Sequence, residues 1–160
     1  MEIRLAQAQD CKDIVALLAQ IGQLHLQGRP DIFRPDTLKY DVAAVEAMLD
    51  DPQRPIFVAA EKGKVYGYAF CICKEVTHHP VLADSTELYI DDLCVDASAR
   101  GMGIGTKLYK AAVAMAKEMG LSRVTLNVWA FNEKALTFYE KCGMKVQRMI
   151  MELPLEDTVC

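Results

Sequence analysis

The chain has 160 residues, of which 52% are hydrophobic and 25% are charged, and this composition is that of a soluble globular protein. Its formal net charge of −4 argues against a nucleic-acid partner, because a protein that binds nucleic acid presents a basic face. No apolar stretch approaches the ~18 residues of a membrane span, and the first residues lack the pattern of a signal peptide. We therefore expect one domain over residues 1–160, without membrane insertion.

The six cysteines, at positions 11, 71, 73, 94, 142 and 160, predict neither a disulfide framework nor a metal site. They are scattered and form no CxxC pair, so they indicate reduced thiols and a cytoplasmic location. Cys71 and Cys73 could only form a metal site with His78 and His79, and that spacing matches no structural zinc pattern. No metal is expected.

The first part of the chain predicts one strand and two helices. Residues 3–6 are apolar enough for a short strand, and Asp10 is placed to cap the next helix. Apolar side chains recur at helical spacing over residues 11–25, which predicts a helix with one buried face. A second helix is expected to begin at Thr37 and to end before Pro52.

The remaining elements alternate between strands and helices. A hairpin is expected from residues 55–60 and 65–76, because a tight polar turn with a glycine separates two strand-like runs. The later elements are strands at 86–95, 123–129 and 145–153 and helices at 106–119 and 132–142. The fold class is therefore α/β (α+β), a mixed and partly antiparallel sheet flanked by helices. Strands 86–95 and 123–129 should be parallel, with a right-handed crossover between them.

Three glycines lie between the strand at 86–95 and the next helix, in Arg100-Gly101-Met102-Gly103-Ile104-Gly105-Thr106. Glycine permits positive φ and close approach of the backbone to a ligand. The first N–H groups of the helix and its dipole then favour an anion such as a pyrophosphate, and Arg100 adds a full charge. A tight turn that binds nothing is the alternative.

Two known phosphate loops do not fit this turn. A Walker A loop that began at Gly101 would need a second glycine where Thr106 stands. A dinucleotide fingerprint from Gly101 or Gly103 would need a glycine at Thr106 or Leu108, and the acidic residue ~20 positions later is missing.

These motifs resemble those of the GNAT superfamily of N-acetyltransferases. Arg100 to Gly105 is similar to the family's Q/R-x-x-G-x-G/A motif, and the run from Tyr89 to Val95 resembles its fourth strand. Asn132 to Met144 resembles its N-x-x-A-x-x-F-Y-x-x-x-G-F/M helix. The match covers roughly residues 55–153. The Ile90-Asp91-Asp92 run is also similar to that of spermidine/spermine-type small-amine acetyltransferases.

The resemblance implies acetyl-CoA as cosubstrate and assigns its contacts. Acetyl-CoA should lie in a cleft between the two parallel strands, which splay apart. The pantetheine arm should pair with the backbone of Leu93, Cys94 and Val95, as an added strand would. The pyrophosphate should bind at Arg100, Gly101, Met102, Gly103, Ile104, Gly105 and Thr106. Asn132 and Tyr139 should contact the cosubstrate from the last helix.

Transfer to an amine requires a base for the amine and an acid for the leaving thiolate. Tyr139 suits the acid, because a phenol stays protonated at neutral pH and can donate to sulfur. By its match to the family's acidic strand residue, Asp91 is the candidate base. Asp92 could hold a cationic substrate, and Glu87 shares the face of Asp91. Adjacent strand residues face opposite sides, so only one of Asp91 and Asp92 should face a given cleft.

Several alternatives stay open on the sequence. The chain could be an acetyltransferase for a small amine or a peptide amine, a module of the same fold that binds acyl-CoA without turnover, or a Rossmann-type nucleotide-binding domain. The thiol of Cys94 could be a nucleophile, but no histidine is near it in sequence, and a buried strand thiol is the expectation. A homodimer through the sheet edge or the last strand is also expected.

Overall fold

The computed structural model describes residues 1–155 and divides the chain into two compact units, Met1–Asn127 and Val128–Cys160. The expectation of one domain over residues 1–160 stays a prediction, and Cys160 lies outside the described residues.

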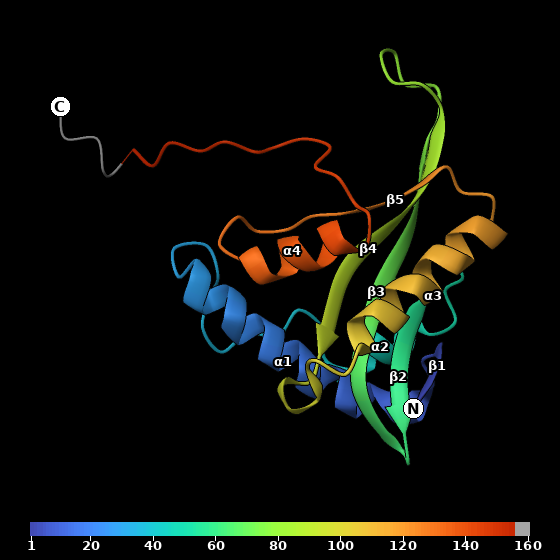
Figure 1. The fold of residues 1–160 in the computed structure, drawn as a ribbon, viewed down its shortest axis with the longest axis vertical. Helices are drawn as coiled ribbons and strands as arrows, with labels where there is room; N and C mark the ends of the chain where they lie inside the picture. The colour runs from blue at the N-terminus through green and yellow to red at the C-terminus, as the bar shows by residue number, and fades with distance from the viewer. Residues whose placement is uncertain (156–160) are drawn as a thin grey trace. The chain divides into compact units, whose positions relative to one another are not determined.

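The first unit is built on a five-stranded sheet whose strands follow one another in the order of the chain (Figure 1). The strands are β1 (Glu2–Leu5), β2 (Ile56–Glu61), β3 (Lys64–Val76), β4 (Ser85–Val95) and β5 (Arg123–Leu126). The first four are antiparallel to their neighbours, and β5 is parallel to β4. The long hairpin of β3 and β4 projects beyond the other strands in Figure 1. This is the mixed α/β sheet that the sequence predicts.

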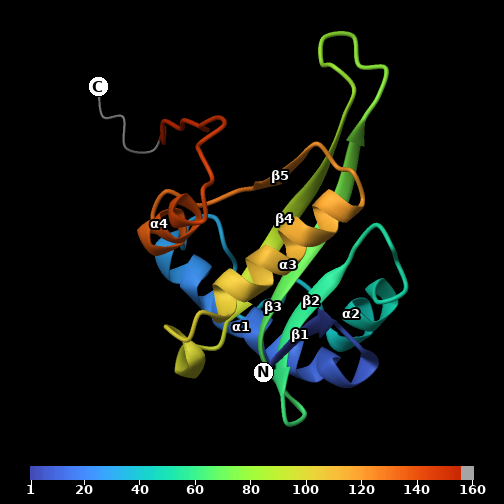
Figure 2. The same cartoon turned by 45° about the vertical axis from the view of Figure 1, so that its right-hand side comes forward.

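Helices cover both faces of this sheet (Figure 2). They are α1 (Cys11–Gly28), α2 (Val42–Met48) and α3 (Ile104–Glu118), with one-turn helices at Ala8–Asp10 and Ala97–Ala99. Alternate residues of the strands separate two cores: Val58 and Tyr68 pack with α1, whereas Ala59 and Ala69 pack with α3. The period of two in a strand explains how one sheet supports both cores.

Two expected helix caps lie elsewhere. Helix α2 begins later than predicted, because the Asp41 carboxylate accepts a hydrogen bond from the Ala44 N–H, while the Thr37 hydroxyl donates to the Arg34 carbonyl within the preceding loop. Asp10 precedes α1 but makes no cap hydrogen bond there. Its carboxylate instead accepts two hydrogen bonds from Arg4, at 2.6 and 3.0 Å.

The second unit contains one helix, α4 (Glu133–Lys141). The Asn132 side chain accepts from the Ala135 N–H, and Gly143 follows the helix with φ of +93°, so both predicted ends are confirmed. The predicted last strand at 145–153 is wrong, because no ladder forms over these described residues. Apolar alternation favours a strand only where a neighbouring strand takes up its hydrogen bonds.

Candidate active site

The parallel strands β4 and β5 stop pairing at Ile90 and Leu126. β5 ends there, three residues after its pairing with β4 begins, whereas β4 continues to Val95 and stays paired with β3 on its other side. Within residues 1–155, the backbone of β4 from Asp91 to Val95 therefore has no ladder partner on the β5 side. A strand edge of this kind can accept an extended ligand by backbone hydrogen bonds.

A β-bulge in β4 changes where the two aspartates lie. Phe70 pairs with Asp92 and Cys71 with Ile90, so Asp91 is the extra residue. Ile90 and Cys71 belong to the core under α3, whereas Phe70 belongs to the core under α1. Asp92 therefore lies on the α1 face. Asp91 follows the α3-facing Ile90, so Asp91 lies on the α1 face as well.

The expectation that the two aspartates face opposite sides is wrong. A bulge inserts one residue and so shifts the alternation of side chains beyond it. The result is two adjacent carboxylates on a single face of the sheet.

Lys39, in the loop between α1 and α2, joins this pair of carboxylates. Its Nζ lies 2.7 Å from Asp91 Oδ2. Burial lowers the pKa of Lys39, but the hydrogen bond and charge of Asp91, together with the charge of Asp92, outweigh it and raise the pKa. The loop is held near the sheet by Tyr40, whose ring lies 5.6 Å from that of Phe70.

Asp92 has the more perturbed carboxyl group. Burial raises the pKa of Asp92 to about 6, against the opposing effects of the Lys39 charge and of the Tyr68 hydroxyl, which donates to Asp92 Oδ2 at 3.2 Å. Tyr68 is fully buried, and burial followed by the charge of Asp92 raises its own pKa. A carboxyl with a pKa near neutral is suited to accept a proton at physiological pH.

Earlier in the same strand, polar side chains link β4 to β5 and to the residue that follows β5. Thr125 donates to Glu87 Oε1 at 3.1 Å, and Asn127 donates to the Tyr89 hydroxyl at 3.1 Å. Alternation from the α3-facing Leu88 and Ile90 places Glu87 and Tyr89 on the face of Asp91, as expected for Glu87.

The glycine turn has the backbone geometry that the sequence suggests. Gly101 and Gly103 have φ of +80° and +73°, and Gly103 is the N-cap of α3. A glycine cap has no side chain to accept from the first N–H groups of the helix, and these groups have no intrahelical partner. A Cβ at Gly101 or Gly103 would meet nothing within 4 Å, so this side of the turn is open.

The other residues of this motif differ in their access to a ligand. Arg100 is exposed and its Nε lies 3.5 Å from the Val95 carbonyl, and Met102 is exposed as well. Ile104 is buried under the sheet, so only its backbone can meet a ligand. Gly105 and Thr106 lie in the first turn of α3.

Cys94 is buried, and its thiol donates to the Leu17 carbonyl. Burial, followed by the charge of Asp92, raises the pKa of Cys94 to about 12, so it is a thiol and not a thiolate at neutral pH. Its flanking residues Leu93 and Val95 turn their side chains to the α3 core, which leaves the backbone of this stretch at the strand edge.

In the second unit, Asn132 and Tyr139 lie on one helix. Asn132 is the N-cap of α4, and Tyr139 follows two turns later with its ring 4.9 Å from that of Phe138 in an edge-on arrangement. The role of Tyr139 as an acid stays a prediction.

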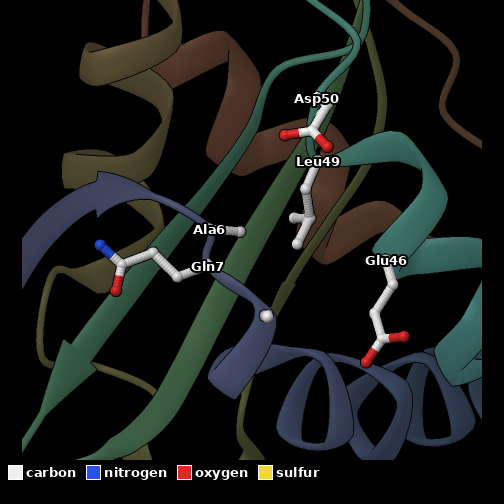
Figure 3. Close-up of a pocket in the computed structure, with 6 residues that line it drawn as sticks. Ala6, Gln7, Glu46, Leu49 and Asp50 are labelled. Carbon is white, nitrogen blue, oxygen red and sulfur yellow. The ribbon is translucent and has the colours of Figure 1, made fainter.

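Two pockets lie apart from the β4 carboxylates and the glycine turn. The larger, of about 560 Å³, is lined by the link from β1 to α1 and by α2, with Gln7, Glu46 and Asp50 around it (Figure 3). It receives no residue of β4 or of the glycine turn. A second hollow of about 230 Å³ lies between α1 and the loop residues Arg34 to Leu38, directly before Lys39.

Sequence reasoning missed Lys39 and Tyr68. Both are far from the aspartates along the chain, and no motif points to them. Within residues 1–155, no group of three or more His, Cys, Asp or Glu side chains could hold a metal ion, and no helix has the length and apolar character to cross a bilayer.

A model of the acetyltransferase (GNAT) family matches residues 20–144, which include the β4 bulge, the glycine turn and α4. The chain belongs to the acetyltransferase (GNAT) family. The resemblance drawn from Arg100 to Gly105 and from Asn132 to Met144 is thereby confirmed.

Among the GNAT relatives, two align with just over half of this chain and a third aligns with most of it. An uncharacterised N-acetyltransferase of Methanocaldococcus jannaschii is 31% identical over 94 residues, which are 59% of this chain and 40% of that protein. N-alpha-acetyltransferase 30 of Schizosaccharomyces pombe is 33% identical over 54% of this chain and 55% of its own. The chain thus spans about half the length of these curated relatives. The thialysine N-epsilon-acetyltransferase of Bos taurus is 24% identical over 88% of this chain and 82% of its own.

Solved structures agree in fold. A tetramutant of the BH1408 protein from Bacillus halodurans has a TM-score of 0.91 and 32% identity, covering 97% of this chain and 100% of its own. An aminoglycoside acetyltransferase from an uncultured soil sample has a TM-score of 0.72 at 20% identity, covering 96% of this chain and 93% of its own, which is a likeness of fold alone.

Proposed function

We propose that this GNAT protein is an N-acetyltransferase that moves an acetyl group from acetyl-CoA to a primary amine by direct attack. One observation carries the proposal: β4 ends in an open backbone edge that leads into a glycine turn and an uncapped helix start. This is the arrangement that a long ligand with a pyrophosphate requires, and it lies in the chain next to two carboxylates on one face.

The residues present fit acetyl-CoA. Gly101 and Gly103 have positive φ, the side where a Cβ would stand is open, and Arg100 is exposed beside them. We assign the pyrophosphate to residues 100–106 and the pantetheine arm to the backbone of Leu93, Cys94 and Val95. Asn132 and Tyr139 are proposed to complete the site from α4.

Bound acetyl-CoA supplies a thioester, from which the acetyl group passes to the amine nitrogen and the sulfur leaves. The protein must take the proton of the amine, and the carboxylates of β4 are the groups suited to it, with Asp91 as the candidate from sequence. The Val95 N–H is the proposed donor to the carbonyl oxygen. The Tyr139 phenol is the proposed proton donor to the departing sulfur.

A cationic amine is the acceptor that the charges favour. Glu87, Asp91 and Asp92 lie on one face of the sheet, and Asp91 already binds an ammonium group, that of Lys39. Relatives are named for acetylation at an N-alpha position and at the N-epsilon of thialysine, so both act on amines. Asp92 and Glu87 are the proposed substrate contacts.

A thermal-shift experiment with acetyl-CoA, CoA, NAD and ATP tests the proposal. A ligand at ~100 times its Kd adds about 2.7 kcal/mol of stability, so acetyl-CoA and CoA should raise the Tm by several degrees. NAD and ATP should not. An unchanged Tm with both CoA species, or a rise with NAD, would contradict it. A screen of amines for release of CoA thiol then identifies the acceptor.

The proposal also covers the location and the oligomeric state of the protein. The protein is proposed to act in the cytoplasm, because Cys11, Cys71 and Cys94 are buried free thiols of the kind that a reducing compartment maintains. It is also proposed to form a homodimer, since a row of apolar side chains after α4 is exposed in the single chain, with Ile150 89% and Met151 88% exposed.

A further inference from the structure

We infer that Lys39 is a positioning residue that divides two roles between adjacent carboxylates: it holds Asp91 as its counter-ion and leaves Asp92 to accept the proton of the acceptor amine. The inference rests on the proposed function. It differs from the sequence-based assignment of the base to Asp91.

Lys39 and Asp91 form a close ion pair. The Nζ to Oδ2 distance of 2.7 Å is that of a charge-assisted hydrogen bond, and the Asp91 side chain is only 16% exposed. A base must be within hydrogen-bond reach of the proton it removes. Lys39 already occupies one oxygen of Asp91, so an acceptor ammonium must share this carboxylate with Lys39 or displace it.

Asp92 is oriented by a buried neighbour. The β4 bulge turns Asp92 to the same face as Asp91, where its Oδ2 accepts from the buried Tyr68 hydroxyl at 3.2 Å. That contact orients the carboxyl group. Asp92 keeps an intermediate exposure, so a ligand can reach it, while burial raises its pKa to about 6. Position and proton affinity together suit a general base.

Several other titratable groups interact with the two carboxylates and with Lys39. Tyr68 and Cys71 come from β3, Tyr89 and Cys94 from β4, and Tyr40 from the loop of Lys39, and each interacts with Asp91, Asp92 or Lys39. The model-compound pKa values of tyrosine and cysteine lie above neutral, so these residue types do not titrate near pH 6. His25 of α1 also interacts with Lys39, and burial followed by that charge lowers its pKa.

The proton balance of the step is complete. An acceptor ammonium gives one proton to the Asp92 carboxylate, the freed nitrogen lone pair forms the N–C bond to the acetyl carbonyl, and the C–S bond breaks. The second amine proton goes to solvent, and the departing sulfur takes a proton from the acid of the site. Lys39 keeps its proton throughout, because the charge of Asp91 favours its ammonium form.

Carboxyl ¹³C NMR of the full chain without acetyl-CoA tests the division of roles directly. The signal that titrates near pH 6 should disappear in Asp92→Asn. In Lys39→Met it should titrate about one pH unit higher, because the charge of Lys39 lowers the pKa of Asp92, and in Asp91→Asn it should titrate lower. Lys39→Arg should restore the wild-type midpoint.

Two variants are controls for this NMR experiment. Lys110→Met removes an exposed lysine on α3, and His25→Gln removes the histidine that interacts with Lys39. Neither should move the midpoint by as much as Lys39→Met does.

Kinetics supply the second readout. Asp92→Asn should lower kcat by about 10²-fold or more, whereas Asp91→Asn should mainly raise KM. The acidic limb of the kcat/KM profile should move to higher pH in Lys39→Met and return in Lys39→Arg. The inference is overturned if Lys39→Met leaves the NMR midpoint unchanged, or if Asp91→Asn loses kcat while Asp92→Asn keeps it. A protein that binds no CoA would refute the proposed function, yet the NMR result would still decide the role of Lys39.

Discussion

At the scale of single residues, Asp10 shows how a polar side chain can have a role that its sequence position conceals. Its position before α1 suggests a cap, but its carboxyl is buried and accepts from Arg4 and from the Gln7 N–H. Burial raises the pKa of Asp10, but the hydrogen bonds and charge of Arg4 and the Gln7 contact outweigh this and lower it. Asp10 is thus the buried half of an ion pair between β1 and the start of α1.

Replacing Asp10 with alanine should reduce the free energy of unfolding by about 3 kcal/mol, because the mostly buried guanidinium of Arg4 loses its two hydrogen bonds to a carboxylate and keeps only the Leu5 carbonyl and the exposed Glu2. Asp31→Ala, which breaks an exposed pair with Arg29, should leave the Tm nearly unchanged. Urea unfolding at pH 7 measures both. Since the folded pKa of Asp10 is lowered, its contribution is present above the ordinary pKa of an aspartate and is lost as pH falls through the folded value. Equal stability of the two variants would contradict this account.

Tyr139 is the residue whose replacement best separates turnover from binding. Tyr139→Phe should lower kcat by about 10²-fold or more, because the departing sulfur loses its proton donor, while the Kd for CoA changes little. Tyr66→Phe, on β3, is the matched control and should keep wild-type kcat. Stopped turnover with unchanged CoA binding supports the proposed acid. An unaffected kcat would remove Tyr139 from that role.

At the scale of elements, the glycine turn and the β4 bulge define the site. The turn needs glycine at Gly103 because an L side chain is strained at a φ of +73°, not because a neighbour is close. Gly67 shows the opposite case, since a Cβ there would come within 2.9 Å of the Cys94 carbonyl oxygen on the paired strand. Gly103 permits a positive φ, and Gly67 permits β3 and β4 to approach each other closely.

Gly103→Ala should lower the stability by about 1 kcal/mol and should weaken CoA binding by more than that loss alone explains. The added strain would be relieved by a change in the turn, which moves the N–H groups away from the pyrophosphate. Gly22→Ala, within α1 with open space at its Cβ, should be neutral or stabilising by up to about 1 kcal/mol. Calorimetry with and without CoA compares the two. Unchanged CoA affinity in Gly103→Ala would argue against the assigned anion site.

At the scale of the whole molecule, the segment after α4 exposes a row of apolar side chains to solvent in the single chain. The exposed apolar side chains there are Val146, Met149, Ile150, Met151 and Leu153. The proposed homodimer would cover them. Light scattering at micromolar concentration should therefore give twice the mass of one chain.

Ile150→Asp should shift that mass toward a single chain, because a charge buried in an apolar contact costs several kcal/mol unless it is paired. Leu82→Asp, at the exposed tip of the β3–β4 hairpin, is the control and should leave the mass unchanged. A wild-type mass of one chain would refute the dimer.

Local patterns in the sequence were enough to predict most of the sheet, the two-sided helical cover, the glycine turn and the caps of α4, because each depends on a period of two or 3.6 or on a residue type suited to one backbone shape. The family motifs also came from contiguous residues. The last strand was predicted wrongly, since a strand needs a partner that the sequence pattern does not name.

The tertiary structure alone decided how the carboxylates are arranged. A single extra residue in β4 brings Asp91 and Asp92 to one face, and the pairing of Phe70 with Asp92 reveals it. It also decided that Lys39, 52 positions from Asp91 along the chain, lies within 2.7 Å of it. Charge interactions depend on distance in space and on burial, and neither quantity can be obtained from the order of the residues.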